Sequence, residues 1–195
     1  GSNILEIGCG WGGFAEYLGT NYDVKLDCIT ISQRQFEFAK ERIHKCGLNE
    51  KVNIEIKDYR DLKKKYDHIV CNPPFFKDSI HNSTQSQSLA RHEIALNLAE
   101  MLEKAVNVLS PDGNIALIIP YARASELLQI SSQVGLHIQR LFSVAPFGHK
   151  PANRLMVSLA KNKVDYHESH LVLRSSAKSY SAEFQQLMQP YYKNF

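Results

Sequence analysis

Strand-like and helix-like segments alternate along almost the whole of this 195-residue chain. The pattern predicts strands over residues 3–7, 24–29, 52–57, 66–71, 114–119, 137–145 and 154–160, and helices over residues 12–19, 32–46, 90–109 and 122–134. Such alternation is typical of a mostly parallel sheet with helices on both faces. The last two strands follow each other without a helix, so we expect them to form an antiparallel hairpin at the sheet edge. The sequence therefore predicts an α/β fold with seven strands.

The first strand runs into a glycine-rich turn, Gly8-Cys9-Gly10-Trp11-Gly12-Gly13, and a helix follows. Glycines let the backbone approach a ligand closely, and the N-terminus of a helix offers free N–H donors and a positive dipole end. Glu6 stands two residues before the first glycine. The turn predicts a site for a nucleotide-like cofactor, and a dinucleotide is one of the ligands that it could hold.

A second motif, Asn72-Pro73-Pro74-Phe75, follows the fourth strand. The Asn72 side-chain oxygen and the Pro73 carbonyl can both accept hydrogen bonds from one exocyclic NH₂ group. Pro73 and Pro74 fix the backbone, and Phe75 offers a ring on which a base can stack. The alternative is an ordinary proline-rich turn that closes a strand.

The glycine turn after the first strand and the NPPF turn after the fourth resemble the motifs of class I S-adenosylmethionine (SAM) methyltransferases. The resemblance implies a Rossmann-like fold and SAM as cofactor. It also implies that Gly8, Gly10 and Gly12 cradle the methionine part of SAM, while Glu6 orients the turn or meets the methionine ammonium.

Two narrower resemblances divide the chain. Residues 3–70, with LEIGCGWGGFAEY and TISQRQ, are similar to the cyclopropane fatty acid synthase family. Residues 66–195, with YDHIVCNPPFF, LARHE and KPANR, resemble the bacterial tRNA (adenine-N6)-methyltransferases that modify A37 of a valine tRNA. A seam at residues 62–70 suggests a hybrid or engineered chain; the alternative is a natural N6-methyltransferase whose cofactor half has drifted.

The resemblances place further cofactor contacts at the ends of the second and third strands. Thr30 stands where an acidic residue commonly binds the ribose, so ribose binding passes to Gln35 with help from Ser32. Asp58 is the expected partner of the SAM adenine amine, with Tyr59 beside the ring. The plainer alternatives are a helix cap with a surface glutamine, and a solvated turn aspartate.

The second half implies contacts with RNA. Arg91 and His92 follow the polar stretch 76–90, and Lys150 and Arg154 flank the hairpin loop, so the resemblance makes all four candidates for phosphate contacts. Ordinary surface charge is the alternative for each of them.

The remaining features describe an ordinary globular chain. We expect one domain over residues 1–195, made of a cofactor half (1–70), an acceptor half (71–160) and a tail (161–195) with a strand at 170–173 and a helix at 182–188. The net charge of +3 is mild, and the four scattered cysteines indicate reduced thiols and no metal site. No signal peptide precedes the first strand of this sequence, so we expect a cytoplasmic protein, and a monomer is favoured. The Gly1-Ser2 start without methionine suggests a trimmed chain.

Together these features predict SAM-dependent N6-methylation of an adenine in RNA, most simply a tRNA, by direct in-line transfer. The nearest rival is an N2-guanine RNA methyltransferase, which also uses an NPPF turn. Methylation of DNA adenine or of a protein glutamine is a second rival, and methylation of a lipid is a poor one. A SAM-binding chain with little or no catalysis, including a hybrid whose halves fit poorly, is a rival of a different class.

Overall fold

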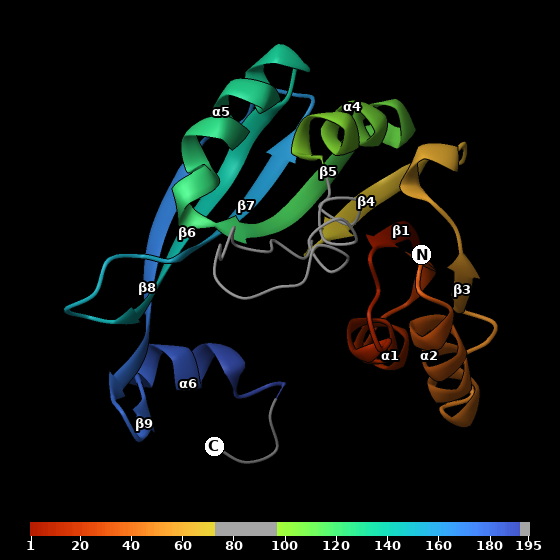
Figure 1. Cartoon of the computed structure of the whole chain (residues 1–195), viewed down its shortest axis with the longest axis horizontal. Coiled ribbons are helices and arrows are strands. Elements are labelled where there is room, and N and C mark those ends of the chain that lie inside the picture. The colour runs from red at the N-terminus through yellow and green to blue at the C-terminus, as the bar shows by residue number, and fades with distance from the viewer. Residues whose placement is uncertain (73–96, 192–195) are drawn as a thin grey trace, which may run out of the picture. The chain divides into compact units, whose positions relative to one another are not determined.

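The computed structural model describes residues 1–72 and 97–191, and the chain divides into two compact units, Gly1–Ile115 and Ala116–Phe195 (Figure 1). The division does not test whether residues 1–195 form a single domain, so that expectation remains a prediction. Among the helices that the structure describes, none is long and apolar enough to cross a membrane.

The first unit is built on four parallel strands in the order β3-β2-β1-β4. These strands are β1 (Ser2–Ile7), β2 (Val24–Thr30), β3 (Val52–Ile56) and β4 (Tyr66–Cys71). The helices of this unit are α1 (Gly13–Asn21), α2 (Gln33–Lys45) and α4 (Leu98–Val108), with a short 3-10 helix at Tyr59–Asp61. Because parallel strands are covered on both faces, β1 and β2 are buried or half-buried along most of their length, although Lys25 of β2 is exposed.

Local sequence signals set the helix bounds in this unit. Ser32 caps α2 by accepting a hydrogen bond from the Gln35 N–H, and Gly47 follows the helix with φ of 67°. Asn97 caps α4 by accepting from the N–H groups of Ala99 and Glu100. Residues 90–96 of the expected helix 90–109 lie outside the described residues.

The strand β5 (Leu109–Pro120) crosses the boundary between the two units and begins directly after α4. The Pro-Asp-Gly sequence at residues 111–113 predicts a turn before this strand, and that prediction is wrong because β5 runs through these residues. Ser110 Oγ donates to Asp67 Oδ1 at 3.1 Å, and Asn114 Oδ1 lies 3.1 Å from His68 Nδ1, so side chains of β4 hold this stretch beside β4. Gly113 allows the approach, because a Cβ there would lie 2.7 Å from the Asp67 carbonyl oxygen.

The second unit contains four strands in the order β7-β6-β8-β9. They are β6 (His137–Phe147), β7 (Arg154–Ala160), β8 (His167–Ser176) and β9 (Ser179–Tyr180). A 3-10 helix (Tyr121–Arg123) leads into α5 (Ala124–Gln133), and α6 (Ala182–Met188) follows β9.

The structure confirms the α/β class, the parallel cofactor-side strands and the antiparallel β6–β7 hairpin. It corrects the place of that hairpin, because β6 also pairs with β8 in parallel and is therefore an inner strand. The tail supplies β8 and β9, so the described residues form nine strands and not seven.

Candidate cofactor and acceptor site

The glycine turn joins β1 to α1 and is anchored to the end of β2. The N–H groups of Gly8 and Cys9 donate to the Ile29 carbonyl at 3.0 and 3.1 Å. Gly8 and Gly10 have φ of 80° and 53°, and a Cβ added at either would meet no atom within 4 Å. The turn therefore needs glycine for its backbone conformation and has open space on its outer side.

Gly12 has a different part in the turn. It caps α1 with φ of 75°, and a Cβ there would lie 3.0 Å from the Cβ of Ala39 on α2. Its lack of a side chain brings the two helices close together. Because Gly12 has no side chain, the N-cap residue accepts no side-chain hydrogen bond from the first-turn N–H groups of α1.

Glu6 lies on β1 beneath this turn and is only 8% exposed. The Cys28 thiol donates to Glu6 Oε2 at 3.4 Å. Burial raises the Glu6 pKa to about 7, and the hydrogen bond from Cys28 opposes the rise. Below that pH the buried carboxyl is therefore neutral, and a cation placed beside it would favour its ionised form.

The end of β2 carries a small hydrogen-bond network. The buried Thr30 hydroxyl donates to Gln35 Oε1 at 2.9 Å and accepts from the Ser32 N–H at 3.2 Å. Ser32 Oγ accepts from the Gln35 N–H at 3.4 Å, so the helix-cap alternative for Ser32 is confirmed. Gln35 still has its side-chain NH₂ as a donor.

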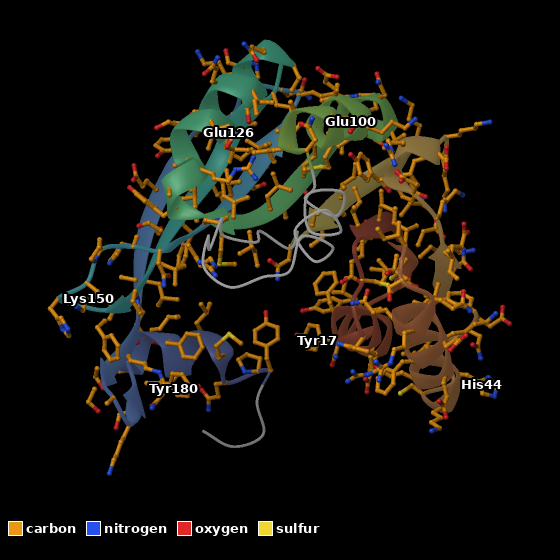
Figure 2. The ribbon with its side chains drawn as sticks, in the orientation of Figure 1. Tyr17, His44, Glu100, Glu126, Lys150 and Tyr180 are labelled. Carbon is orange, nitrogen blue, oxygen red and sulfur yellow. The ribbon has the colours of Figure 1, made fainter. Side chains whose placement is uncertain are left out.

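Asp58 and Tyr59 follow β3, and both have partners within the protein. Arg60 donates to Asp58 from its backbone N–H and from its guanidinium at 2.6 to 2.9 Å, and these bonds hold the pKa of the carboxyl below its usual range. A carboxylate has about four acceptor positions, so one remains for a further donor. The Tyr59 hydroxyl donates to Glu100 Oε2 on α4 at 3.0 Å (Figure 2 labels Glu100).

Asn72 is exposed and follows β4 directly. β1 and β4 are neighbours, and Ile7 is the Cα partner of Cys71. Gly8 and Asn72 therefore leave adjacent strands at the same level, as expected for two motifs at the carboxyl ends of parallel strands. Pro73, Pro74, Phe75, Arg91 and His92 lie outside the described residues.

Two apolar side chains near these strand ends were missed by the sequence reasoning. Ile31 follows β2 and is 64% exposed, and Ile56 ends β3 and is 47% exposed. The signal was present in the sequence, since an isoleucine at or just beyond the end of a parallel strand has fewer neighbours to cover its side chain. Their exposure offers an apolar surface beside Thr30 and Asp58.

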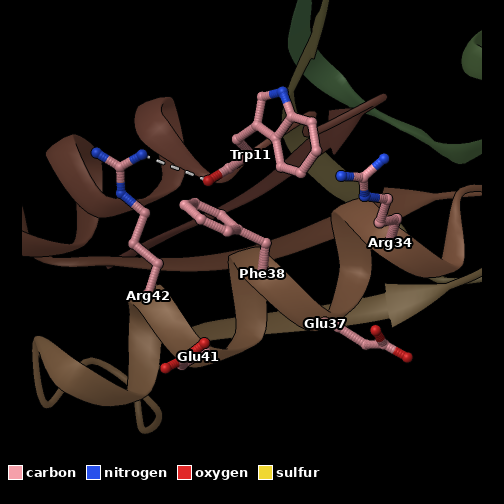
Figure 3. A pocket seen from close by; sticks show the side chains of 6 residues that line it. All are labelled: Trp11, Arg34, Glu37, Phe38, Glu41 and Arg42. Atoms are coloured by element: carbon pink, nitrogen blue, oxygen red, sulfur yellow. Dashed lines mark hydrogen bonds between the residues drawn. The ribbon is translucent and has the colours of Figure 1, made fainter.

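A shallow hollow lies beside the turn, on the outer side of α2 (Figure 3). The rings of Trp11 and Phe38 meet edge to face at 5.2 Å, and Arg42 donates to the Trp11 carbonyl at 3.4 Å, while Glu37 and Glu41 point away from Trp11. None of the residues predicted to bind SAM lines this hollow. The residues predicted to bind SAM lie instead at the strand ends, around the open turn and the polar network.

Lys150 and Arg154 belong to the second unit. Lys150 lies exposed in the loop between β6 and β7 (labelled in Figure 2), and its N–H donates to the Phe147 carbonyl at 2.9 Å. Arg154 begins β7, and its guanidinium donates to the Asn153 carbonyl at 3.0 Å. Within residues 1–72 and 97–191, the Lys150 ammonium has no hydrogen-bond partner, and the Arg154 guanidinium has only the Asn153 carbonyl.

Comparisons with known proteins identify the fold and the family of the chain. The fold is similar to a predicted O-methyltransferase from Agrobacterium tumefaciens, with a TM-score of 0.70 and 13% identity over 96% of this chain and 88% of that one. A family model described as mycolic acid cyclopropane synthetase matches residues 1–167.

Two relatives match nearly the whole sequence, and both carry the name tRNA1(Val) (adenine(37)-N6)-methyltransferase. The protein from Trichodesmium erythraeum is 30% identical over 98% of this chain and 83% of its own length. The protein from Parabacteroides distasonis is 32% identical over 97% of this chain and 82% of its own length.

These matches extend both resemblances beyond the halves on which they were first seen. The family model and the two relatives all run across residues 62–70, so the comparisons give no division of the chain there. The hybrid origin stays an untested hypothesis. From its fold, its family model and its relatives, the chain belongs to the class I SAM-dependent methyltransferases, in the family of the tRNA1(Val) (adenine(37)-N6)-methyltransferases.

Proposed function

We propose that this enzyme methylates N6 of an adenine in tRNA, the reaction named for its relatives. The observation that carries the proposal is the position of Asn72, which leaves β4 directly beside the strand that leads into the glycine turn. An acceptor for an amine is thereby adjacent to the turn where SAM binds. A single domain over residues 1–195, with both halves needed for turnover, is part of the proposal.

The residues at the strand ends fit SAM. The open space over Gly8 and Gly10 accommodates the methionine part, and the buried Glu6 carboxyl provides a partner for its ammonium. We assign the ribose hydroxyls to the side-chain NH₂ of Gln35, which Thr30 holds through the amide oxygen, with Ser32 capping the same helix.

The adenine part of SAM has both a polar and an apolar neighbour in this assignment. The remaining acceptor position of Asp58 receives the adenine amine, and Tyr59 lies next to it in the chain. The exposed side chains of Ile31 and Ile56 give the ring an apolar surface. When bound, SAM supplies a methyl group already activated by its sulfonium.

The protein then has to align and polarise the acceptor amine. The lone pair of an adenine amine is delocalised into the ring, so the nitrogen is a weak nucleophile until it becomes pyramidal. The Asn72 side-chain oxygen accepts one N–H, and the sequence assigns the other to the Pro73 carbonyl, with Pro74 and Phe75 completing the turn. These acceptors favour the tetrahedral nitrogen, and the surplus proton leaves to solvent after transfer.

The acceptor adenine must leave its base stack to reach such a site. An anticodon loop allows this more easily than a duplex, because its bases are already partly unstacked. We propose that Lys150 and Arg154, with Arg91 and His92, contact the surrounding phosphates, and that the enzyme acts as a monomer.

The test is methyl transfer from labelled SAM to unmodified tRNA, followed by nucleoside analysis. We expect N6-methyladenosine from the wild-type chain and from the control Asn49→Ala, whose exposed side chain contacts His44 far along α2. We expect a loss of about a hundredfold or more from Asn72→Ala, because an amine acceptor aimed at the reacting atom has gone.

The products and the SAM affinity separate the alternatives. N2-methylguanosine as the product would identify the guanine rival instead. SAM binding by calorimetry without turnover on any tRNA would indicate a non-catalytic chain. Equal activity of Asn72→Ala and wild type would overturn the role of Asn72.

A further inference from the structure

The second unit places aromatic and cationic side chains in one row across three neighbouring strands. Phe147 on β6 is the Cα partner of Arg174 on β8, and Arg174 is in turn the partner of Tyr180 on β9. Cα partners on adjacent strands project their side chains from the same face of a sheet. The three side chains therefore stand side by side on one face.

Ring contacts extend this row at both ends. The His149 ring stacks on Phe147 with centroids 5.5 Å apart and an angle of 24° between the planes. The Arg174 guanidinium lies over the Tyr180 ring at 4.4 Å, and Tyr180 packs against Phe184 of α6 at 4.9 Å. We call His149, Phe147, Arg174, Tyr180 and Phe184 the aromatic row.

The charge of the second unit is strongly positive. Residues 116–195 contain nine Lys and Arg against four Asp and Glu, a net charge of +5, whereas residues 1–115 carry −2. The stretches 127–164 and 169–182, which carry the row apart from Phe184, contain no Asp or Glu, whereas Glu183 directly precedes Phe184. The exposed Lys150 follows His149, and the exposed Lys178 lies in the β8–β9 turn, two residues before Tyr180.

We propose that the aromatic row is a docking platform for unpaired nucleotides of the RNA, with Lys150 and Lys178 against their phosphates. Aromatic rings and a flat guanidinium offer faces on which successive bases stack, and every base has such a face. The positive field attracts the phosphate backbone and makes the affinity depend on salt. This inference rests on the proposed function only in taking RNA as the substrate, and it concerns residues in the second unit, outside the SAM site.

Binding is measured by fluorescence anisotropy with a labelled RNA hairpin that has the sequence of a valine tRNA anticodon arm. We expect Tyr180→Leu and Arg174→Gln each to weaken binding about tenfold, since each removes one stacking face. Tyr180→Phe keeps the ring and retains most of the affinity. Lys25→Gln, which removes an exposed cation from β2, is the matched charge control.

A second variant guards against a folding defect at β9. Lys150→Gln with Lys178→Gln changes only exposed side chains, and we expect it to reduce the slope of log affinity against log salt by about 2. Calorimetric SAM binding should match wild type in all of these variants, because the SAM residues lie in the first unit.

The two proposals fail separately in this design. Wild-type RNA affinity in Tyr180→Leu and Arg174→Gln would overturn the platform even if tRNA is methylated. Loss of self-association in those variants, with RNA affinity unchanged, would also overturn it and assign the row to a second copy of the chain. RNA binding that depends on the row, without any methylated product, would support the platform and contradict the proposed reaction.

Discussion

At the scale of single residues, the fold changes the chemical properties of a few side chains at the strand ends by burying them. Glu6 is the clearest case, because it lies on an inner strand beside the Cys28 thiol and has no cationic partner among the described residues. Its pKa of about 7 is a consequence of burial. The ionised carboxyl therefore destabilises the free protein, and a cationic group beside it, as proposed for the methionine ammonium of SAM, would offset that cost.

This cost gives the protein a pH dependence. The folded chain holds a proton on Glu6 up to about pH 7, whereas the unfolded chain loses it near the ordinary glutamate pKa of 4.5. The free energy of unfolding therefore falls as pH rises through this window, by about 3 kcal/mol in total. We expect Glu6→Gln to remove that fall in urea unfolding at pH 5 and pH 8.

The exposed Glu50 supplies the control for this experiment. Glu50→Gln should keep the wild-type dependence on pH, since its side chain is in solvent. A Glu6→Gln protein with the same loss of stability between pH 5 and pH 8 would contradict the assignment to Glu6.

A second residue-scale prediction concerns Gly10. Gly10→Ala and Gly47→Ala both introduce a side chain at positive φ into open space, so each should destabilise the protein by about 1–2 kcal/mol. Only the first adds a methyl group to the space assigned to SAM. We expect calorimetry to show a large loss of SAM affinity in Gly10→Ala and nearly wild-type affinity in Gly47→Ala; equal affinities would place the cofactor elsewhere.

At the scale of elements, α4 packs into the core of the first unit and also contacts the 3-10 helix at Tyr59–Asp61. Its buried side chains are Leu98, Met101, Leu102, Ala105 and Val108, and Glu100 on its first turn accepts from Tyr59. Asn97 begins the helix by accepting from two backbone N–H groups. The cap therefore helps to fix Tyr59, next to Asp58, as well as the helix.

Removing this cap should have a measurable cost. We expect Asn97→Ala to lower the free energy of unfolding by about 1 kcal/mol in denaturant titration, because two N–H groups lose their acceptor. Asn97→Asp keeps an acceptor oxygen and should stay close to wild type. If both variants lose the same amount, the loss does not come from the cap.

At the scale of the whole molecule, the two units carry opposite net charges and different parts of the proposed chemistry. The first unit holds every residue assigned to SAM and carries −2, and the second holds the aromatic row and carries +5. The mild overall charge of +3 hides this separation. A positively charged unit attracts the phosphate backbone of RNA, and the attraction is stronger where the positive charge is concentrated.

The separation predicts different responses to the two ligands. S-adenosylhomocysteine at a hundred times its Kd should stabilise the protein by about 2.7 kcal/mol and raise Tm by about 5–10 °C. We expect hydrogen exchange to slow in the glycine turn with this ligand, and in β8 and β9 with the RNA hairpin. Protection of β8 and β9 by S-adenosylhomocysteine alone would contradict the division of roles.

Much of the fold was determined by the sequence itself. The bounds of β4, β7 and α6 were predicted without error, and for β4 and β7 the reason is that a strand buried in a sheet has a strong local apolar signal. Order along the chain also placed the glycine turn and Asn72 at one edge, since parallel strands bring their carboxyl ends together. The family resemblance then identified the expected cofactor as SAM.

The tertiary structure decided the features that depend on neighbours. The stretch around Gly113 reads locally as a turn, and only the bonds from β4 make it a strand. The sequence shows Glu6, but its pKa depends on burial, which only the fold determines. The sequence also shows Asp58 and Arg60, but not that the Arg60 guanidinium donates to the Asp58 carboxylate. The aromatic row joins three strands through register, so it exists only where long-range pairing has placed Phe147, Arg174 and Tyr180 side by side.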